Sequence, residues 1–229
     1  MFLKNMSINA IVLGIFALTG TIILAYTDII TKPKIEAEQR HFLLRSLNIL
    51  VPEDQRDNDI FNDVIYVTAP NLLGSTKPVA IYRARMKSKP VAVIINSLAP
   101  DGYNGKIYLL VAINNNGELA GVRVSKHIET PGLGDGIDIR KSDWILQFVG
   151  KSLANTSKQL WAVKKDGGQF DEFTGATITP RAVVKAIQNT LLYFKANRDN
   201  LFKIQDKTIR SESENKKLHI QIKNFSETK

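Results

Sequence analysis

Residues 105–125 read GKIYLLVAIN, then Asn115-Asn116-Gly117, then ELAGVRVS. Branched aliphatic and aromatic residues dominate the outer stretches, as is typical of strands, and the asparagines and glycine between them tolerate the positive φ of a tight turn. The segment therefore predicts a β-hairpin. Three further strand patterns precede it, separated by proline and glycine, and they cover residues 64–68, 79–86 and 91–97.

Helical patterns flank these strands. The stretch KIEAEQRHFLLRSLNIL at 34–50 places apolar residues at helical spacing with charges between them, and Pro52 ends the pattern. Ser142 is a suitable N-cap for a short helix over 143–149, and we expect another short strand to begin at Trp161. The order of helix, strands and helix predicts an α+β domain with a central, largely antiparallel sheet and flanking helices.

The last helical pattern runs from Pro180 to about Asn197. We expect Thr179 to cap it and Pro180 to occupy the first helical position, where the missing N–H costs nothing. Beyond Phe202 the sequence becomes rich in charged and polar residues, which predicts a polar C-terminal tail over 203–229. One face of the helix should pack on the sheet through Val183, Val184, Ile187, Leu191 and Phe194.

The N-terminus carries an uncharged apolar segment, INAIVLGIFALTGTIILAYT at 8–27. Its 20 residues are enough for a helix to cross a hydrocarbon core of roughly 30 Å, so we predict a single transmembrane helix within an anchor over 1–30. A cleaved signal peptide or a buried core helix are the alternatives. Lys4 precedes the segment while Lys32 and Lys34 follow it, so the charge count does not orient it.

Composition excludes several kinds of chemistry. The chain has 229 residues, no cysteine and three histidines, which excludes thiolate nucleophiles and makes a multi-histidine metal site improbable; we predict no metal site. It has 31 basic and 22 acidic residues and a net charge of +9, but no nucleic-acid-binding motif, so we predict no nucleic-acid partner. A redox role would need a cofactor that is not held by sulfur.

The run DEFTGAT at 171–177 stands directly before the last predicted helix. A Gly-Ala step between two threonines lets the backbone approach a ligand closely, and the following helix offers free N–H groups and the positive end of its dipole. Such a place suits a phosphate. An ordinary turn before a helix is the alternative interpretation.

Two more clusters could contribute to a site. In HIETPGLGD at 127–135, proline and glycine shape a tight loop that offers one carboxylate, one hydroxyl and one apolar side chain, although a plain connecting loop would look the same. We expect His127 to have a structural or hydrogen-bonding role, because no second residue forms a catalytic pair with it. The run DGYNGKI at 101–107 reads equally well as a glycine turn.

These motifs resemble those of the FMN-binding domain shared by the periplasmic flavin subunits of Rnf and Na+-translocating NADH:quinone reductase complexes. DEFTGAT is similar to the family's Asp-x-x-Ser/Thr-Gly-Ala-Thr motif, HIETPGLGD to a stretch that lines the flavin ring, and DGYNGKI to its Gly-Tyr-x-Gly-x-Ile segment. The run WAVKKDGGQFDEFTGATITPRAVV looks like the RnfG branch of this family rather than the quinone-reductase branch.

The resemblance implies a role for particular residues. Thr177 would carry FMN through a phosphoester bond made by a dedicated flavin transferase. The transferase would recognise Asp171, Thr174, Gly175, Ala176 and Thr177, and the other cofactor contacts would be Thr174, Gly175, Ala176, Glu129, Thr130 and Leu133. No residue is expected to be catalytic by itself, because the flavin performs the redox chemistry.

The function implied is that of a membrane-anchored electron-transfer protein. It would work within a multisubunit complex that couples electron transfer to ion translocation across the bacterial inner membrane, with residues 34–202 as an FMN domain in the periplasm. The corresponding flavin component of a Na+-translocating quinone reductase, a stand-alone FMN-domain reductase and a periplasmic module that binds an anion without redox work are the alternatives.

Overall fold

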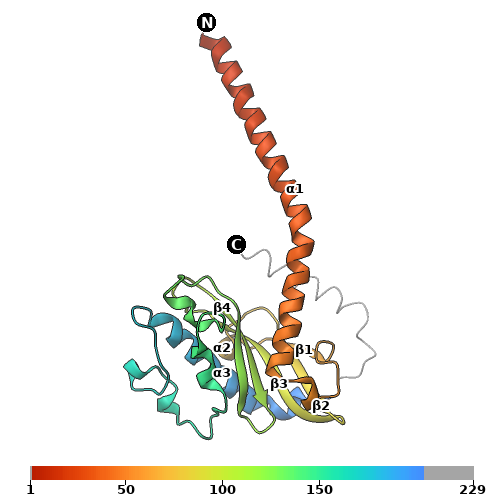
Figure 1. Ribbon diagram of the computed structural model, residues 1–229, viewed down its shortest axis with the longest axis vertical. Coiled ribbons are helices and arrows are strands. Elements are labelled where there is room, and N and C mark those ends of the chain that lie inside the picture. Colours follow the sequence, from red (N-terminus) through yellow and green to blue (C-terminus); the bar gives the residue numbers. More distant parts are fainter. Residues whose placement is uncertain (1, 204–229) are drawn as a thin grey trace. The chain divides into compact units, whose positions relative to one another are not determined.

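The computed structural model describes residues 2–203, with side chains from Ile8 onward. A single helix, α1 (Phe2–Leu50), contains both the predicted apolar segment and the predicted amphipathic helix (Figure 1). Pro33 lies inside it; a proline there removes one backbone hydrogen bond, at a cost of about 3 kcal/mol, and the helix continues through it. Among the described helices, α1 from Ile8 is the one long and apolar enough to span a membrane.

A five-stranded antiparallel sheet forms the centre of the compact unit that begins at Leu43. The strands lie side by side in chain order, and each pairs with the next through a hairpin or a longer loop. This confirms the predicted α+β class and its antiparallel sheet. The strands are β1 (Val64–Val67), β2 (Val79–Met86), β3 (Lys89–Ala99), β4 (Ile107–Asn114) and β5 (Leu119–Lys126).

Two hairpin turns set the register of the sheet. Between β4 and β5, Gly117 has φ +92° and donates its N–H to the carbonyl of Asn114 at 2.8 Å, as the sequence predicts. Between β2 and β3, Lys87 and Ser88 have φ of 51° and 62°, the two positive angles that a type I′ turn requires. The carboxylate of Asp57 accepts a hydrogen bond from the Lys87 N–H at 2.6 Å and supports this unfavourable backbone.

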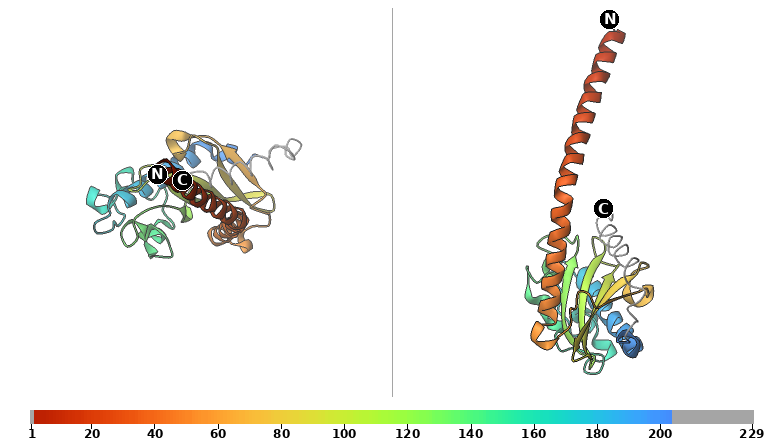
Figure 2. Two further views of the ribbon diagram at one scale, coloured as in Figure 1. Left: turned by 90° about the horizontal axis from the view of Figure 1, so that it is seen from above. Right: turned by 90° about the vertical axis from the view of Figure 1, so that its right-hand side faces the viewer.

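The helices and 3-10 turns cover both faces of the sheet. The α3 helix (Ile178–Leu201) runs along one face, as Figure 2 shows in blue, and the last two turns of α1 pack against the other. The short helix α2 (Pro70–Leu73) lies where the sequence predicted only a proline-containing break. The 3-10 helices are η1 (Glu53–Gln55), η2 (Gly134–Ile137), η3 (Asp143–Phe148), η4 (Lys158–Leu160) and η5 (Lys164–Asp166).

Two local predictions were wrong. The α3 helix begins at Ile178 with Thr177 as its N-cap, so Thr179 is not the cap and Pro180 is the third helical residue. Trp161 begins no strand: it ends η4, and its buried ring packs 5.1 Å from that of Phe170. The predicted short helix after Ser142 is the 3-10 helix η3, and the Ser142 side chain caps it by accepting from the Trp144 N–H, as expected.

The C-terminal end of α3 is tied to the edge of the sheet. Arg83, which is 3% exposed, pairs with Asp63 and donates to the carbonyls of Leu201 and Lys203. These contacts satisfy carbonyl groups that a helix end leaves without a partner. The α3 helix ends at Leu201, four residues beyond its predicted end. Apart from Lys203, the predicted tail over 203–229 lies outside the described residues.

Candidate functional site

The segment before α3 forms a tight turn. The Ala176 N–H donates to the carbonyl of Phe173 at 3.0 Å, which leaves Thr174 and Gly175 as the two central residues. Gly175 has φ +80°, the angle that the second central residue of a type II turn adopts and that glycine adopts at no steric cost. Both central residues are exposed, so the turn presents the Thr-Gly step to solvent.

Thr177 follows this turn at the N-terminus of α3. Its backbone is helical, with φ −76° and ψ −27°, and its carbonyl accepts the Arg181 N–H at 3.2 Å. Its side chain makes no capping hydrogen bond, and within residues 2–203 its hydroxyl has no hydrogen-bond partner. Thr177 is half-buried, and its hydroxyl lies at the N-terminus of α3, next to the positive end of the helix dipole.

A cleft of about 500 Å³ brings two of the sequence clusters together. The loop after β5 supplies one wall through Leu133 and Gly136, and the segment before α3 supplies another through Phe173 and Thr174. This volume lies within the usual range of ligand sites, about 300–1,000 Å³. The remaining lining residues are Gly132, Asp135, Lys141, Ser142 and Glu172.

Aromatic packing holds these two walls together. The ring of Phe173 lies 5.4 Å from that of Trp144, and the indole N–H of Trp144 donates to the carbonyl of Asp171 at 2.6 Å. A Cβ atom on Gly136 would lie 2.8 Å from the Phe173 ring, so only glycine leaves room for it. The sequence prediction gave Trp144 no role in the site, and it included Phe173 and Gly136 only as parts of the run at 171–177 and of the glycine-rich loop, since their packing is set by contacts across the chain.

Glu129 lies beneath the site rather than on its surface. It is 4% exposed, and its carboxylate accepts hydrogen bonds from the Asn104 N–H at 3.1 Å and from the Thr179 hydroxyl at 2.5 Å. The neighbouring Thr130 accepts a hydrogen bond from the Asn104 side chain at 2.9 Å. The structure thus brings the third cluster, 101–107, beside the other two.

Leu133 and the exposed turn lie close together. Leu133 is 47% exposed, and a Cβ atom on Gly175 would lie 3.9 Å from its side chain. Ala176, like Thr177, is half-buried. Of the cofactor contacts expected from the sequence, Leu133 and Thr174 line the cleft, Gly175 adjoins it through Leu133, and Glu129 is enclosed below it.

His127 has a defined hydrogen-bonding position. Its Nδ1 accepts the Glu129 N–H at 3.2 Å, and its Nε2 lies 3.9 Å from a carboxylate oxygen of Asp138. Burial by itself would raise the pKa of the Asp138 carboxyl, but hydrogen bonds from Arg140 and the charges of Arg140 and His127 lower the pKa overall. His127 therefore fastens the loop after β5, in keeping with the structural role expected for it.

The charged residues around the N-terminus of α3 are paired. Arg181 binds both carboxylate oxygens of Asp166, at 2.5 and 2.6 Å, and these hydrogen bonds lower the pKa of Asp166. Asp171 pairs with Lys164 on the surface, and the hydrogen bond between them raises the pKa of Lys164. The backbone N–H groups of α3 are thus left as the main attraction for an anion at this place.

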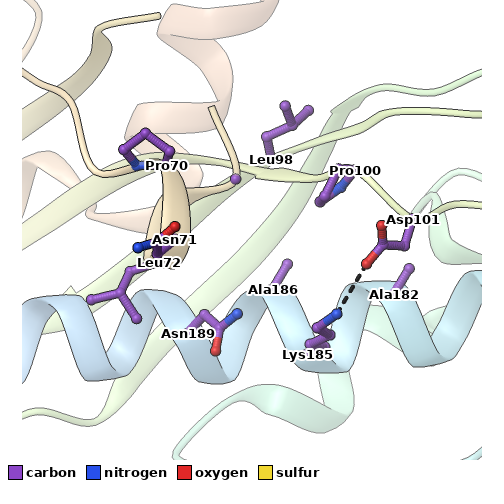
Figure 3. Close-up of a pocket in the computed structure, with 11 residues that line it drawn as sticks. Pro70, Asn71, Leu72, Leu98, Pro100, Asp101, Ala182, Lys185, Ala186 and Asn189 are labelled. Atoms are coloured by element: carbon purple, nitrogen blue, oxygen red, sulfur yellow. Dashed lines mark hydrogen bonds and ion pairs between the residues drawn. The ribbon is translucent and has the colours of Figure 1, made fainter. Parts of the chain in front are cut away.

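A second cavity lies along α3, between α2 and the end of β3 (Figure 3). It encloses about 100 Å³, and the ion pair of Lys185 with Asp101, 3.0 Å long, lies at its rim. This volume is below the usual size of a ligand site. Of the three sequence clusters, only Asp101 reaches it, so we place the functional site at the larger cleft.

The part of the chain that the structure describes contains no group of three or more His, Asp or Glu side chains that could hold a metal ion. Besides the charged side chains of Asp135, Lys141 and Glu172, the cleft offers hydroxyl groups, backbone amides and apolar surface as its means of binding. Such a set suits an organic ligand with an anionic end.

Comparisons with known proteins show which families this chain matches. The model of the FMN-binding domain family matches residues 102–192, and that of the RnfG N-terminal region matches residues 1–50. A protein of Shewanella loihica, named as the G component of an ion-translocating oxidoreductase complex, is 48% identical over 193 residues, which cover 84% of this chain and 91% of the relative. Proteins of the same name from Pseudoalteromonas atlantica and Shewanella baltica are 47% and 46% identical, cover 85% and 88% of this chain, and align over 90% and 96% of their own lengths.

Proposed function

This chain belongs to the RnfG family, the G components of ion-translocating oxidoreductase complexes, and we propose that it carries FMN covalently on Thr177. Its family and its FMN-binding domain confirm the predicted electron-transfer role within a translocase complex, and they favour the Rnf-type assignment over the alternatives. The other subunits of that complex are its implied partners. We also propose which residues surround the flavin and on which side of the membrane the FMN domain lies.

The free hydroxyl of Thr177 is the observation that carries the proposal. It stands at the N-terminus of α3 without a hydrogen bond inside the described residues, whereas the hydroxyl of Thr179, two residues later, is buried and bonded to Glu129. Thr174, which lines the cleft, is only three residues away, a span of at most about 11 Å of extended chain. A flavin ring in the cleft and a phosphate on Thr177 can therefore belong to one cofactor.

The cleft suits a planar ring with polar edges. Leu133 and Phe173 supply apolar contacts, while the hydroxyl of Thr174 can bind the ring's polar atoms. FMN bound there would accept and donate electrons, and the chain's own residues would hold it in place and exclude competing reactions. We therefore expect no side chain here to transfer electrons itself.

The helix N-terminus would stabilise the esterified phosphate. Esterification leaves the phosphate with one remaining acidic group, and the end of a helix contributes about 0.3–1 kcal/mol to an anion placed there. Arg181 is already bound to Asp166, so its charge is largely compensated. The amide of Ile178, an exposed residue in the first turn of the helix, is the donor we assign to the phosphate.

The attachment segment is accessible to a modifying enzyme. Asp171, Thr174 and Gly175 are exposed, and Asp171 has only a surface ion pair to lose on binding. We propose that a flavin transferase recognises Asp171 and the run from Thr174 to Thr177. The Thr177 oxygen would attack the flavin phosphorus of an activated donor, a phosphoanhydride; the hydroxyl proton leaves the oxygen while the phosphoanhydride P–O bond breaks and the other phosphate departs.

We further propose that the protein crosses the inner membrane once, through an anchor within residues 1–30, and that residues 34–202 form the FMN domain on the periplasmic side. The apolar part of α1 supports the single crossing. The periplasmic orientation rests on the family resemblance, because the lysines on either side of the segment balance each other.

Mass spectrometry tests the attachment. The protein purified from its own host should be heavier by FMN minus water, with the added mass on the peptide that contains Thr177 and flavin fluorescence retained after denaturation. Thr177→Ala should remove both signals while the protein stays folded. Thr174→Ala, which changes a neighbouring exposed threonine, should weaken attachment less. An unmodified mass from cells that possess the transferase would leave the non-redox binding module as the better interpretation.

A further inference from the structure

Glu129 connects three segments that are far apart in the sequence. One carboxylate oxygen accepts the N–H of Asn104, in the loop before β4, and the other accepts the hydroxyl of Thr179, in the first turn of α3. Glu129 itself lies in the loop after β5, which lines the cleft through Leu133 and Gly136. A single buried side chain therefore links the loop before β4, the loop after β5 and the first turn of α3.

Two glycines enclose this carboxylate. A Cβ atom on Gly102 would lie 2.8 Å from one oxygen of Glu129, and a Cβ atom on Gly134 would lie 2.8 Å from the other. The second of these Cβ atoms would also come within 2.8 Å of the Thr179 hydroxyl. The backbone thus closes around the Glu129 and Thr179 pair, and the carboxylate is directed into the protein.

The first turn of α3 lacks the usual means of fixing a helix start. Thr177 is the N-cap, but its side chain makes no capping bond, and Pro180 at the third helical position has no N–H to offer. Uncapped helix ends leave donors unsatisfied and fray. Thr179 is fully buried, and its hydroxyl bonds to Glu129. Arg181 adds an exposed ion pair with Asp166, so the bond of Thr179 is the contact that holds this turn from inside the protein.

We propose that Glu129 is a positioning residue that acts through Thr179: it fixes the first turn of α3 so that the Thr177 hydroxyl is presented for flavin attachment, and it does not itself contact the flavin. This inference rests on the proposed attachment at Thr177, but it makes a separate claim about the protein before any flavin is bound. That claim can be tested on the flavin-free chain.

Hydrogen–deuterium exchange of the flavin-free, full-length protein in detergent is the first measurement. Thr179→Val removes the hydroxyl and keeps the shape, so amides in the peptide over 174–182 should exchange about tenfold faster or more, since a hydrogen bond to a charged group is lost. Unchanged exchange in this peptide would overturn the proposal, whatever the outcome for flavin attachment.

Thr190→Val is the matched control. Thr190 is also a fully buried threonine of α3, and its hydroxyl bonds to the Ser97 hydroxyl at 2.7 Å, about 16 Å along the helix from Thr179. Both substitutions remove one buried hydroxyl and its hydrogen bond from the same helix, and only the bond of Thr179 goes to a charged group. Only Thr179→Val should speed exchange at the first turn of α3, and an equal effect of Thr190→Val would reduce Glu129 to a general contributor to stability.

Flavin attachment gives the second readout. With the transferase present, Thr179→Val and Glu129→Ala should each slow the labelling of Thr177 about 10- to 100-fold, the usual effect of misplacing a reacting group by about 1 Å, while Thr190→Val labels normally. Glu129→Gln keeps an acceptor for Asn104 and a polar group facing Thr179, so it should label faster than Glu129→Ala.

A double-variant cycle separates positioning from direct contact. If Glu129 acts through Thr179, adding Thr179→Val to Glu129→Ala should slow labelling little further, because each substitution already removes the hydrogen bond between the two residues. Additive losses, together with a flavin spectrum that changes in Glu129→Gln but not in Thr179→Val, would instead place Glu129 against the flavin. Failure of the wild type to label, or labelling of Thr177→Ala, would contradict the proposed function and leave the exchange result standing.

Discussion

The two faces of the sheet are packed in different ways. On the face that α3 covers, large side chains fill the core, and the rings of Phe148 and Phe170 stack at 4.6 Å. On the opposite face, Leu47 and Leu50 from the end of α1 pack in a cluster that holds four alanines beside larger side chains such as Tyr82, and a Cβ atom on Gly121 would come within 2.9 Å of Leu50. The alanines of that face are Ala80, Ala84, Ala92 and Ala112.

This difference separates two tasks. Small residues let the end of α1 lie close to the strands, whereas aromatic residues on the other face reach outward to the loops of the cleft. Phe148 contacts Trp144, and Trp144 in turn holds Phe173 and Asp171. The α3 face should therefore control flavin binding, and the α1 face should control only the stability of the domain.

Phe148→Ala should have the largest effect. The ring is fully buried between Trp144 and Phe170, so its loss should lower the free energy of unfolding by about 3–5 kcal/mol. Because Trp144 loses its support, the folded fraction should also carry less flavin. Urea unfolding of the full-length protein in detergent and flavin fluorescence per folded molecule would measure both quantities, and normal flavin content would contradict the link between the aromatic core and the cleft.

Leu47→Ala tests the α1 face. Leu47 is fully buried, and we expect a loss of about 2–3 kcal/mol, at the lower end for leucine because small neighbours allow the site to close around the cavity. Flavin content per folded molecule should equal that of the wild type. If it falls as far as in Phe148→Ala, the two faces do not act independently.

Gly136→Ala should affect the cleft more than the fold. The added methyl group would meet the Phe173 ring at 2.8 Å, and overpacking of this kind costs about 1–3 kcal/mol. The ring should shift into the cleft and reduce flavin binding at a modest cost in stability. Gly150→Ala, at a glycine with open space around it, controls for the general effect of replacing a glycine, although its φ of +75° adds some strain.

The smallest effect that we predict is a dependence of stability on pH through Asp138. Burial favours the neutral carboxyl, but the bonds from Arg140 prevail and the pKa is lower in the folded protein than in the unfolded chain. The stability that this carboxylate contributes is therefore complete above its unfolded-state pKa and is lost as the pH falls through the folded-state value. In Asp138→Asn, the free energy of unfolding should fall less steeply as the pH is lowered into the acid range. The same steepness as in the wild type would contradict this assignment.

Local patterns predicted most of the secondary structure. The β2 strand has its predicted bounds, and the β4–β5 hairpin forms around the predicted turn, because alternating side chains and turn residues act over a few neighbouring positions. The sequence missed the type I′ turn at Lys87 and Ser88, since neither residue favours positive φ and the support comes from Asp57, some thirty residues away. Trp161 was misassigned because its burial against Phe170 depends on how the loop folds back.

The sequence by itself determined that an apolar helix precedes an α+β domain and that the Thr-Gly-Ala-Thr run meets the start of a helix, because helix length, strand alternation and turn preference are local properties. Only the tertiary structure decided which threonine is free and which is bonded: Thr177 keeps its hydroxyl unbonded within the described residues, while Thr179 is buried on Glu129. That choice depends on a contact between residues 129 and 179, which no local pattern encodes.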